Sequence, residues 1–324
     1  AGFDERRFAR MVARRHNTDH TELVVKPDAA SLLERLVWYH DQPFGDSSAL
    51  PTYLLSELAS KKVKVVLAGD GGDELFAGYE RFAAARIVSA AGRLPKRVRE
   101  LAGSAGLSRF GFGRRRALER LLSALGQPVP DAYLSWVSYV PASWRERLCT
   151  DQDDWALAEY HRCWRASAGA SLLDRLLLLN LRTYLLDDLL PKVDRMAMAH
   201  GLEVRSPFLD TELVELALRI PPSAKLRALS GKRALKQAAR GLVPAEVLAR
   251  RKHGFGVPLD AWFRAELRPY IEGRLLPSSA RLRSHLNGSA LDQLVAEHMS
   301  GASDHGQVLW TLATLEEFLR KRGW

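Results

Sequence analysis

The stretch VVLAGDGGDELFAGYERF, residues 65–82, sets three acids against glycines directly after an apolar run. Residues 64–67 predict a short buried strand, because β-branched residues dominate them. Glycines that follow a strand let the backbone turn sharply or approach a ligand closely. Asp70, Asp73 and Glu74 therefore fall at the carboxyl end of a strand, where parallel sheets bind ligands. The alternative is a plain turn whose acids only stabilise the next helix.

The chain has 324 residues, 47% of them hydrophobic, which is enough for one large domain or two small ones. No apolar run reaches the roughly 20 residues of a membrane helix. The leucine-rich segment 172–191 is interrupted by charges, and it predicts a mostly buried helix that stops at Pro191. Cys149 and Cys163 do not make a disulfide framework or a zinc motif. No signal peptide is visible, so the expected setting is cytoplasmic.

The formal net charge of +10 has three interpretations: nucleic-acid binding, an anionic substrate such as ATP, or a solvated basic surface. Much of the charge lies in local runs, such as residues 109–120. Neither zinc-finger spacing, nor an RNA-binding aromatic signature, nor an evident recognition helix accompanies it. Nucleic acid is therefore not the expected partner.

Apolar periodicity predicts an α/β beginning and a helical remainder. After about Tyr79 no convincing strand follows, and the last helix places Val308, Leu312, Leu315 and Leu319 on one face. Strand, helix and strand at this spacing favour a parallel sheet. The early elements expected are helices at 5–16, 28–40 and 51–62 and strands at 21–25 and 64–67.

Three further stretches place polar groups among apolar residues. Residues 189–210 carry several charges that we expect to be partly buried, either as a structural ion-pair network or around a ligand. Lys252 precedes a glycine-rich turn, which is typical of a phosphate-binding lysine, although a plain exposed lysine fits as well. Asp46 and Ser47 precede a predicted helix, as a cap or as the wall of a polar pocket.

Together these stretches resemble the C-terminal synthetase domain of glutamine-dependent asparagine synthetases. The resemblance rests on GDGGDELFAGY (69–79), LLPKVDRMAMAHGLEVRSPFLD (189–210) and RKHGFGVPLDAWF (251–263), with support from residues 3–13 and 42–56. It implies one ATP-pyrophosphatase domain over residues 1–324. Residues 1–82 would form an α/β remnant of the nucleotide-binding sheet, and residues 83–324 an all-helical region.

The chemistry implied by the resemblance is an amidation. ATP would transfer AMP to the side-chain carboxylate of aspartate, and ammonia would then displace AMP to give asparagine. The implied cofactors are ATP and Mg²⁺. In this scheme Asp73 holds magnesium at the pyrophosphate, since Mg²⁺ prefers carboxylate oxygens. Lys252 neutralises the phosphate charge that grows as pyrophosphate leaves.

The remaining site residues follow from the same motifs. Asp70 would lie beside the reacting amine, so Asp70, Glu74 and Lys252 are the catalytic candidates. The ATP- and pyrophosphate-binding candidates are Ala68, Gly69, Gly71, Gly72 and Lys252. The substrate-pocket candidates are Asp46, Ser47, Lys192, Asp194, Arg195 and Arg205.

Two parts of the family pattern are missing from these residues: a glutaminase domain with its leading cysteine, and the S-G-G-x-D-S loop that binds pyrophosphate through backbone N–H groups. We therefore expect a fragment that lacks one or two strands and is inactive alone. The implied partners are aspartate, ATP, ammonia from glutamine, the missing glutaminase domain and a second copy in a homodimer. Two alternatives stay open: a related amide-forming synthetase of the β-lactam or lasso-peptide type, and a non-catalytic basic module that binds RNA or a protein.

Overall fold

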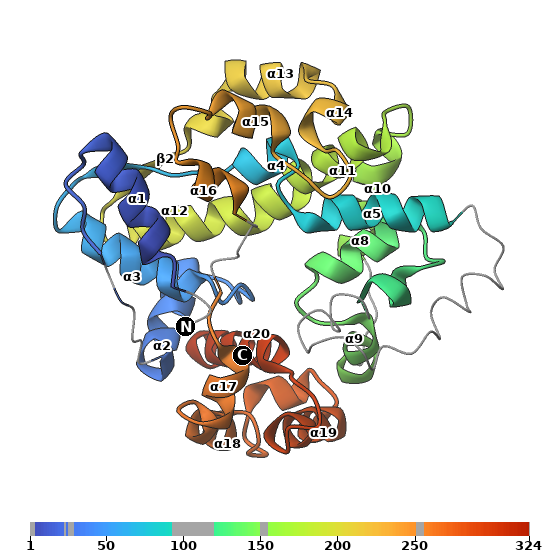
Figure 1. Cartoon of the computed structure of the whole chain (residues 1–324). Helices are drawn as coiled ribbons and strands as arrows, with labels where there is room; N and C mark the ends of the chain where they lie inside the picture. The colour runs from blue at the N-terminus through green and yellow to red at the C-terminus, as the bar shows by residue number, and fades with distance from the viewer. Residues whose placement is uncertain are drawn as a thin grey trace.

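The structure is a computed structural model that describes residues 4–22, 24, 29–92, 120–149, 155–250 and 256–323. These residues are mostly helical, with one small parallel sheet, which confirms the predicted fold class (Figure 1). The first elements are α1 (Arg6–His16), α2 (Ala29–His40), α3 (Ala49–Ser60), β1 (Val65–Leu67), α4 (Gly72–Phe76) and α5 (Glu80–Ala91).

The central elements are α8 (Val129–Val137), α9 (Ala142–Leu148), α10 (Trp155–Ala166), α11 (Leu172–Asn180), the π-helix η1 (Leu181–Leu189), α12 (Leu190–Met198) and β2 (Glu203–Arg205). The last are η2 (Pro207–Leu209), α13 (Thr211–Arg219), α14 (Pro222–Lys225), α15 (Arg233–Ala238), α16 (Ala245–Ala249), α17 (Leu259–Arg264), α18 (Arg268–Arg274), η3 (Arg281–Ser284), α19 (Gly288–Met299) and α20 (Gly306–Arg322). None of the helices in the described ranges is long and apolar enough to cross a membrane.

The sheet joins two segments far apart in the chain. β1 pairs in parallel with β2, and Val66 lies opposite Val204. β2 lies in the region that was expected to be all-helical. The prediction for that region therefore missed this three-residue strand. The predicted burial of β1 was wrong, because Val65 and Leu67 share a face that no described element covers, and Leu67 is 73% exposed.

The predicted strand at 21–25 was also wrong at its described positions. Thr21, Glu22 and Val24 are irregular, and Val24 is exposed. A strand needs a neighbouring strand to satisfy its backbone groups. The sheet in the described residues consists of β1 and β2 alone, so Thr21, Glu22 and Val24 pair with neither strand.

The leucine-rich segment forms one long helix rather than ending at Pro191. α11, η1 and α12 follow one another without a break, and Pro191 is the second residue of α12. Proline normally stops a helix because its ring clashes with the carbonyl four residues earlier. The π-helical turns directly before it are wider, which relieves that clash. The prediction that Pro191 stops this helix was therefore wrong.

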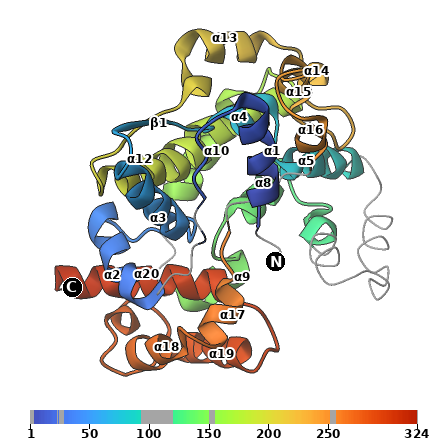
Figure 2. The same ribbon diagram turned by 60° about the vertical axis from the view of Figure 1, so that its left-hand side comes forward.

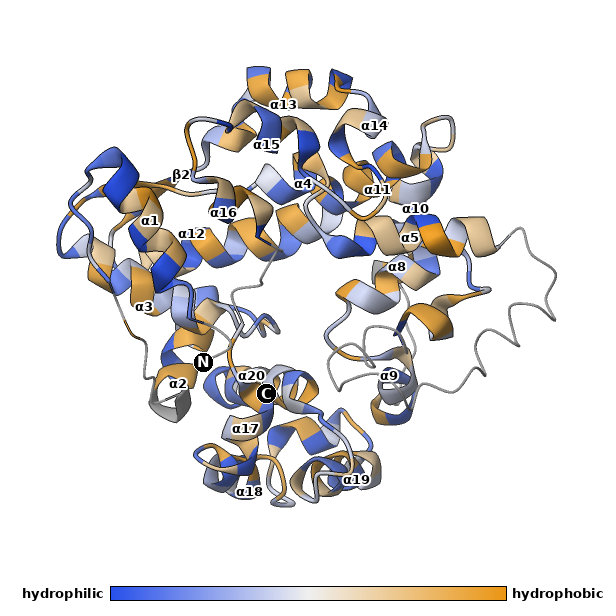
Figure 3. Cartoon of the chain, viewed as in Figure 1, coloured by the Kyte–Doolittle hydropathy of each residue, from blue (hydrophilic) through white to orange (hydrophobic). Residues whose placement is uncertain are grey.

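The largest hydrophobic core lies around the C-terminal helix α20, which packs against α2, α17 and α18. In both views α17–α19 lie together below α20 (Figures 1 and 2). Val308, Leu312 and Leu319 are buried and Leu315 is partly buried, as their spacing predicted. Apolar and polar residues alternate along most helices, as expected for elements with one buried face (Figure 3). A second core joins α5, α8, α10 and α11.

Candidate functional site

The turn between β1 and α4 requires glycine at position 71. Gly71 has φ +91°, and a Cβ there would lie 2.4 Å from Leu209 Cδ2, so both backbone and packing exclude a side chain. A Cβ added at Gly69 would meet no atom within 4 Å, which leaves that backbone open. Gly71 is also the N-cap of α4, so no acidic side chain occupies the cap itself.

The acids of the first turn of α4 are buried and paired. Asp73 is 9% exposed, and its Oδ1 lies 2.9 Å from Lys232 Nζ. Glu74 is 2% exposed and accepts a hydrogen bond from Tyr79 Oη. Asp70, just before the cap, is half-buried. Buried carboxylates require such partners, because desolvation of an unpaired charge is costly.

Lys232 is a site residue that was not predicted from the sequence, as are Tyr139 and Asp188 of the second polar group described below. Its backbone N–H donates to Phe76 O at 2.9 Å, and its φ is +55°. A Cβ on Gly231 would lie 2.0 Å from Ala77 O, so the segment fits against α4 only with glycine there. The available signal was this glycine directly before a lysine at the start of a helix.

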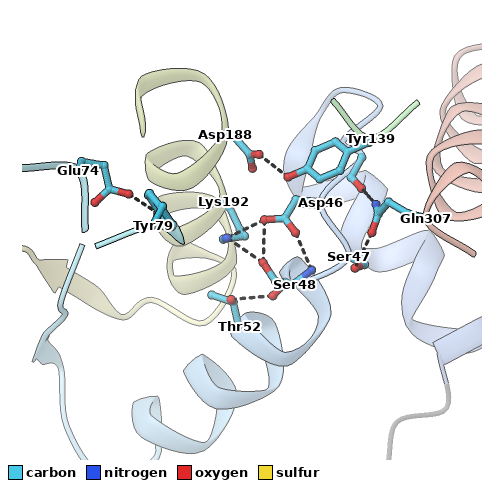
Figure 4. Close-up of polar contacts among 11 residues, drawn as sticks. Asp46, Ser47, Ser48, Thr52, Glu74, Tyr79, Tyr139, Asp188, Lys192 and Gln307 are labelled. Carbon is cyan, nitrogen blue, oxygen red and sulfur yellow. Dashed lines mark hydrogen bonds and ion pairs between the residues drawn. The ribbon is translucent and has the colours of Figure 1, made fainter. Parts of the chain in front are cut away.

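A second polar group, the Asp46 cluster, consists of Asp46, Ser48, Lys192, Tyr139 and Asp188 (Figure 4). Lys192 Nζ lies 2.7 Å from Asp46 Oδ2 and donates to Ser48 Oγ at 2.8 Å. Ser48 in turn donates to Asp46 through its backbone N–H at 2.9 Å and its hydroxyl at 2.7 Å. Tyr139 Oη donates to Asp188.

Burial and neighbouring charges shift the pKa values of the two carboxyl groups of this cluster in opposite directions. Burial opposes the charge of Asp46, but the ammonium of Lys192 holds the pKa of Asp46 below its ordinary value. Burial raises the pKa of Asp188 to about 7, and the negative charge of Asp46 adds to the effect. Such a split between neighbouring carboxyl groups is common in functional sites.

The π-helix η1 lies between the Asp46 cluster and the acids of α4. Tyr184 packs edge-on against Tyr79, the partner of Glu74, with ring centroids 6.0 Å apart. Asp188 follows four residues later in the Asp46 cluster. A π-helical segment inside a longer helix often marks a functional site. The two polar groups are therefore parts of one connected region.

The other substrate-pocket candidates lie less centrally. Ser47 donates to Gln307 Oε1 at 3.3 Å, next to the Asp46 cluster. Arg195 is partly buried, whereas Asp194 is exposed on α12. Arg205 is exposed and pairs with Glu203 at 2.7 Å. Lys252 lies outside the described residues, so its phosphate-binding role stays a prediction.

The acids of α4 offer oxygen donors of the kind that a magnesium ion prefers. The described residues contain no group of three or more His, Cys, Asp or Glu side chains able to hold a metal. Mg²⁺ at phosphates, however, is usually held by one or two carboxylates together with phosphate oxygens and water. Asp73, a carboxylate with Lys232 beside it, fits a metal ion that is held mainly by the phosphates.

Comparison with known proteins gives a consistent result over most of the chain. The asparagine synthase family matches residues 1–320. A Mycobacterium bovis protein, provisionally assigned as a glutamine-hydrolysing asparagine synthetase, is 34% identical over 96% of this chain and 48% of its own length. Glutamine-hydrolysing asparagine synthetase 1 of Bacillus subtilis is 28% identical over 96% of this chain and 49% of its own length.

More distant relatives include an amidase, chyE, of Penicillium rubens, which is 25% identical over 81% of this chain and 42% of its own length. The chain spans about half the length of the curated synthetases it matches. The match over residues 1–320, together with the buried acids that the GDGGDE segment places at the start of α4, shows that this chain belongs to the asparagine synthase family.

Proposed function

We propose that this chain is the synthetase part of an enzyme that uses ATP to convert aspartate to asparagine. The observation that carries the proposal is the start of α4, where the buried carboxylates Asp73 and Glu74 follow β1 directly and Lys232 supplies a cation. A carboxylate with a cation beside it provides groups for both metal and phosphate binding. The family membership supports the same chemistry.

The reaction would proceed in two steps. A side-chain carboxylate oxygen of aspartate attacks the α-phosphorus of ATP, and pyrophosphate leaves to give a β-aspartyl-AMP intermediate. Ammonia, released from glutamine elsewhere in the full-length protein, then attacks the acyl carbon. AMP leaves with the oxygen that bridged carbon and phosphorus, which gives asparagine.

The residues divide these tasks by chemistry. Asp73 would hold Mg²⁺, which neutralises charge on the leaving pyrophosphate, and Lys232 and Lys252 would bind the phosphates. The open backbone at Gly69, with Ala68, Gly71 and Gly72, would border the nucleotide. Asp70, at the mouth of the turn, would receive a proton from the attacking amine.

The Asp46 cluster would form one wall of the aspartate pocket. The ammonium group of Lys192 on α12 would attract an anionic substrate. Arg195 lies on the same helix, and Ser47 lies just before α3. Asp194 and Arg205 would border the same pocket because they belong to the same motif as Lys192, although both are exposed in the structure.

The proposal is tested by aspartate-dependent exchange of labelled pyrophosphate into ATP, measured in the full-length protein. We expect Asp73→Asn to slow exchange by at least about tenfold, since one charged ligand is worth about 1.4 kcal/mol or more. The matched control is Asp292→Asn on α19, whose exposed carboxylate pairs with Arg283 far from this site. Exchange at the wild-type rate in Asp73→Asn at saturating magnesium would remove Asp73 from the site.

A second acceptor class is favoured by the similarity to the fungal amidase. A related synthetase would adenylate a different carboxylate and form another amide. The exchange assay separates the two, because exchange that needs a carboxylate other than aspartate assigns the chain to this second class.

A further inference from the structure

Arg81, the second residue of α5, holds its guanidinium group among three tyrosine rings. The group lies 3.8 Å from the ring centroid of Tyr79 and 4.6 Å from that of Tyr184. The ring of Tyr133 follows at 5.6 Å. A guanidinium this close to aromatic faces is attracted by their quadrupoles, most strongly where water is excluded.

The edge of the same guanidinium is fixed by hydrogen bonds that it donates to two other helices. Arg81 Nε donates to Tyr133 Oη on α8 at 2.8 Å, and Nη2 donates to Asn180 Oδ1 on α11 at 3.1 Å. Tyr133 Oη also donates to Asn180 Oδ1 at 2.6 Å, which closes the network. Nothing in the described part of the chain offers Arg81 a carboxylate partner, so its contacts there serve to hold its orientation.

The ring that Arg81 covers carries the hydroxyl that bonds Glu74. Figure 4 shows Tyr79 turned toward Glu74, and Tyr79 Oη donates to the buried carboxylate. Burial raises the pKa of Tyr79, as does the adjacent charge of Glu74, so the phenol stays protonated and remains a donor. The orientation of Arg81 therefore affects the position of the Tyr79 ring, and through it the position of Glu74.

We propose that Arg81 is a positioning residue for the adenylation site: it fixes the ring of Tyr79 so that the phenol holds the Glu74 carboxylate beside Asp73. The proposal deepens the proposed function and rests on it. Small displacements of a catalytic group slow a reaction strongly even when substrate binding is retained. Arg81 itself acts only through Tyr79 and does not contact the reacting atoms.

The test is a double-mutant cycle in the full-length protein, followed by pyrophosphate exchange. We expect Arg81→Met and Tyr79→Phe each to lower kcat by about tenfold or more, with KM for ATP changed less than about threefold. The double variant should lose no more than either single one, since both act through the same bond. Arg81→Lys, which keeps a cation over the ring, should recover part of the rate. The matched control is Arg86→Met, an exposed arginine on the same helix.

Activity-independent evidence comes from ultraviolet resonance Raman spectra of tyrosine. The wild-type minus Tyr79→Phe difference isolates the hydrogen-bond state of Tyr79. Arg81→Met and Arg81→Lys should weaken its donor signature, and Arg86→Met should leave it intact. If no carboxylate supports pyrophosphate exchange in the wild-type protein, the proposed function is contradicted. The spectrum would still show whether Arg81 positions Tyr79. Losses that add in the double variant, or an unchanged donor signature in both Arg81 variants, would overturn the proposal.

Discussion

The lack of a side chain at Gly78 leaves room for the ion pair between Asp73 and Lys232. A Cβ at this position would lie 1.8 Å from Asp73 Oδ1 and 2.4 Å from Lys232 Cε. Gly78 also donates its backbone N–H to Asp73 O at 2.8 Å, so the backbone cannot easily move away. The ion pair between Asp73 and Lys232 therefore fits only when residue 78 has no Cβ atom.

Gly78→Ala is expected to displace the carboxylate or the ammonium group and to slow pyrophosphate exchange by about tenfold or more. The matched control is Gly273→Ala on α18, because a Cβ there meets no atom within 4 Å. Exchange rates for both variants are measured at saturating ATP and magnesium. Unchanged exchange in Gly78→Ala, with the variant folded, would show that the Asp73–Lys232 pair is not needed.

Residue spacing predicted the acids of α4 but not their partners. Asp73 and Glu74 fall at the start of a helix after a strand, which local sequence can indicate. Lys232 reaches Asp73 from a distant segment, which the packing of Gly231 against Ala77 and a backbone hydrogen bond to α4 hold in place. Proximity in a motif was equally insufficient for Arg205, which lies in the same motif as Lys192 yet is exposed.

Between elements, the pair of Lys192 and Asp46 connects α12 to the loop that leads into α3. Both side chains are about one-tenth exposed, with values of 9% and 11%. Removing one partner of a buried pair leaves the other charge without compensation, and this is more costly than losing a surface pair. The pair therefore contributes to the docking of these two helices.

Lys192→Met is expected to lower the free energy of unfolding by about 3 kcal/mol or more at pH 7, because Asp46 then stays buried without its cation. In the wild type the pKa of Asp46 is depressed, so its contribution is present above the ordinary pKa of 3.8 and is lost as pH falls below it. The deficit of the variant should therefore narrow toward acid pH, as measured by urea unfolding.

The matched control for this prediction is Lys61→Met. Lys61 makes an exposed pair with Glu57, and its loss should cost no more than about 0.5 kcal/mol. Equal losses in Lys61→Met and Lys192→Met would contradict the structural importance of the Lys192–Asp46 pair.

Helices were predicted more reliably than the way in which they continue or pair. The ends of α1 and α2 and the buried face of α20 follow from local periodicity. The prediction of a stop at Pro191 was wrong because local sequence does not reveal the π-helical turns that accommodate this proline. β2 was missed because three residues carry little periodicity, and its pairing with β1 is a long-range contact.

Across the whole molecule, the candidate site depends on contacts between distant parts of the chain. α4 supplies the acids, the segment before α15 supplies Lys232, and α5, α8 and α11 hold the network around Arg81. The central helix of α11, η1 and α12 runs through the structure and contributes Asn180, Tyr184 and Lys192 (Figure 1). The resemblance of motifs suggested which segments form the site, whereas only the three-dimensional structure shows how these segments come together.

The most direct measurement of the central claim follows oxygen from aspartate into AMP. The full-length protein is supplied with ATP, magnesium, ammonia and aspartate labelled with ¹⁸O in its side-chain carboxylate, and AMP is analysed by mass spectrometry. Attack of the carboxylate on the α-phosphorus predicts AMP that carries one ¹⁸O atom, together with unlabelled pyrophosphate. Unlabelled AMP would contradict adenylation of aspartate at this site. So would the release of ADP together with inorganic phosphate that carries the ¹⁸O.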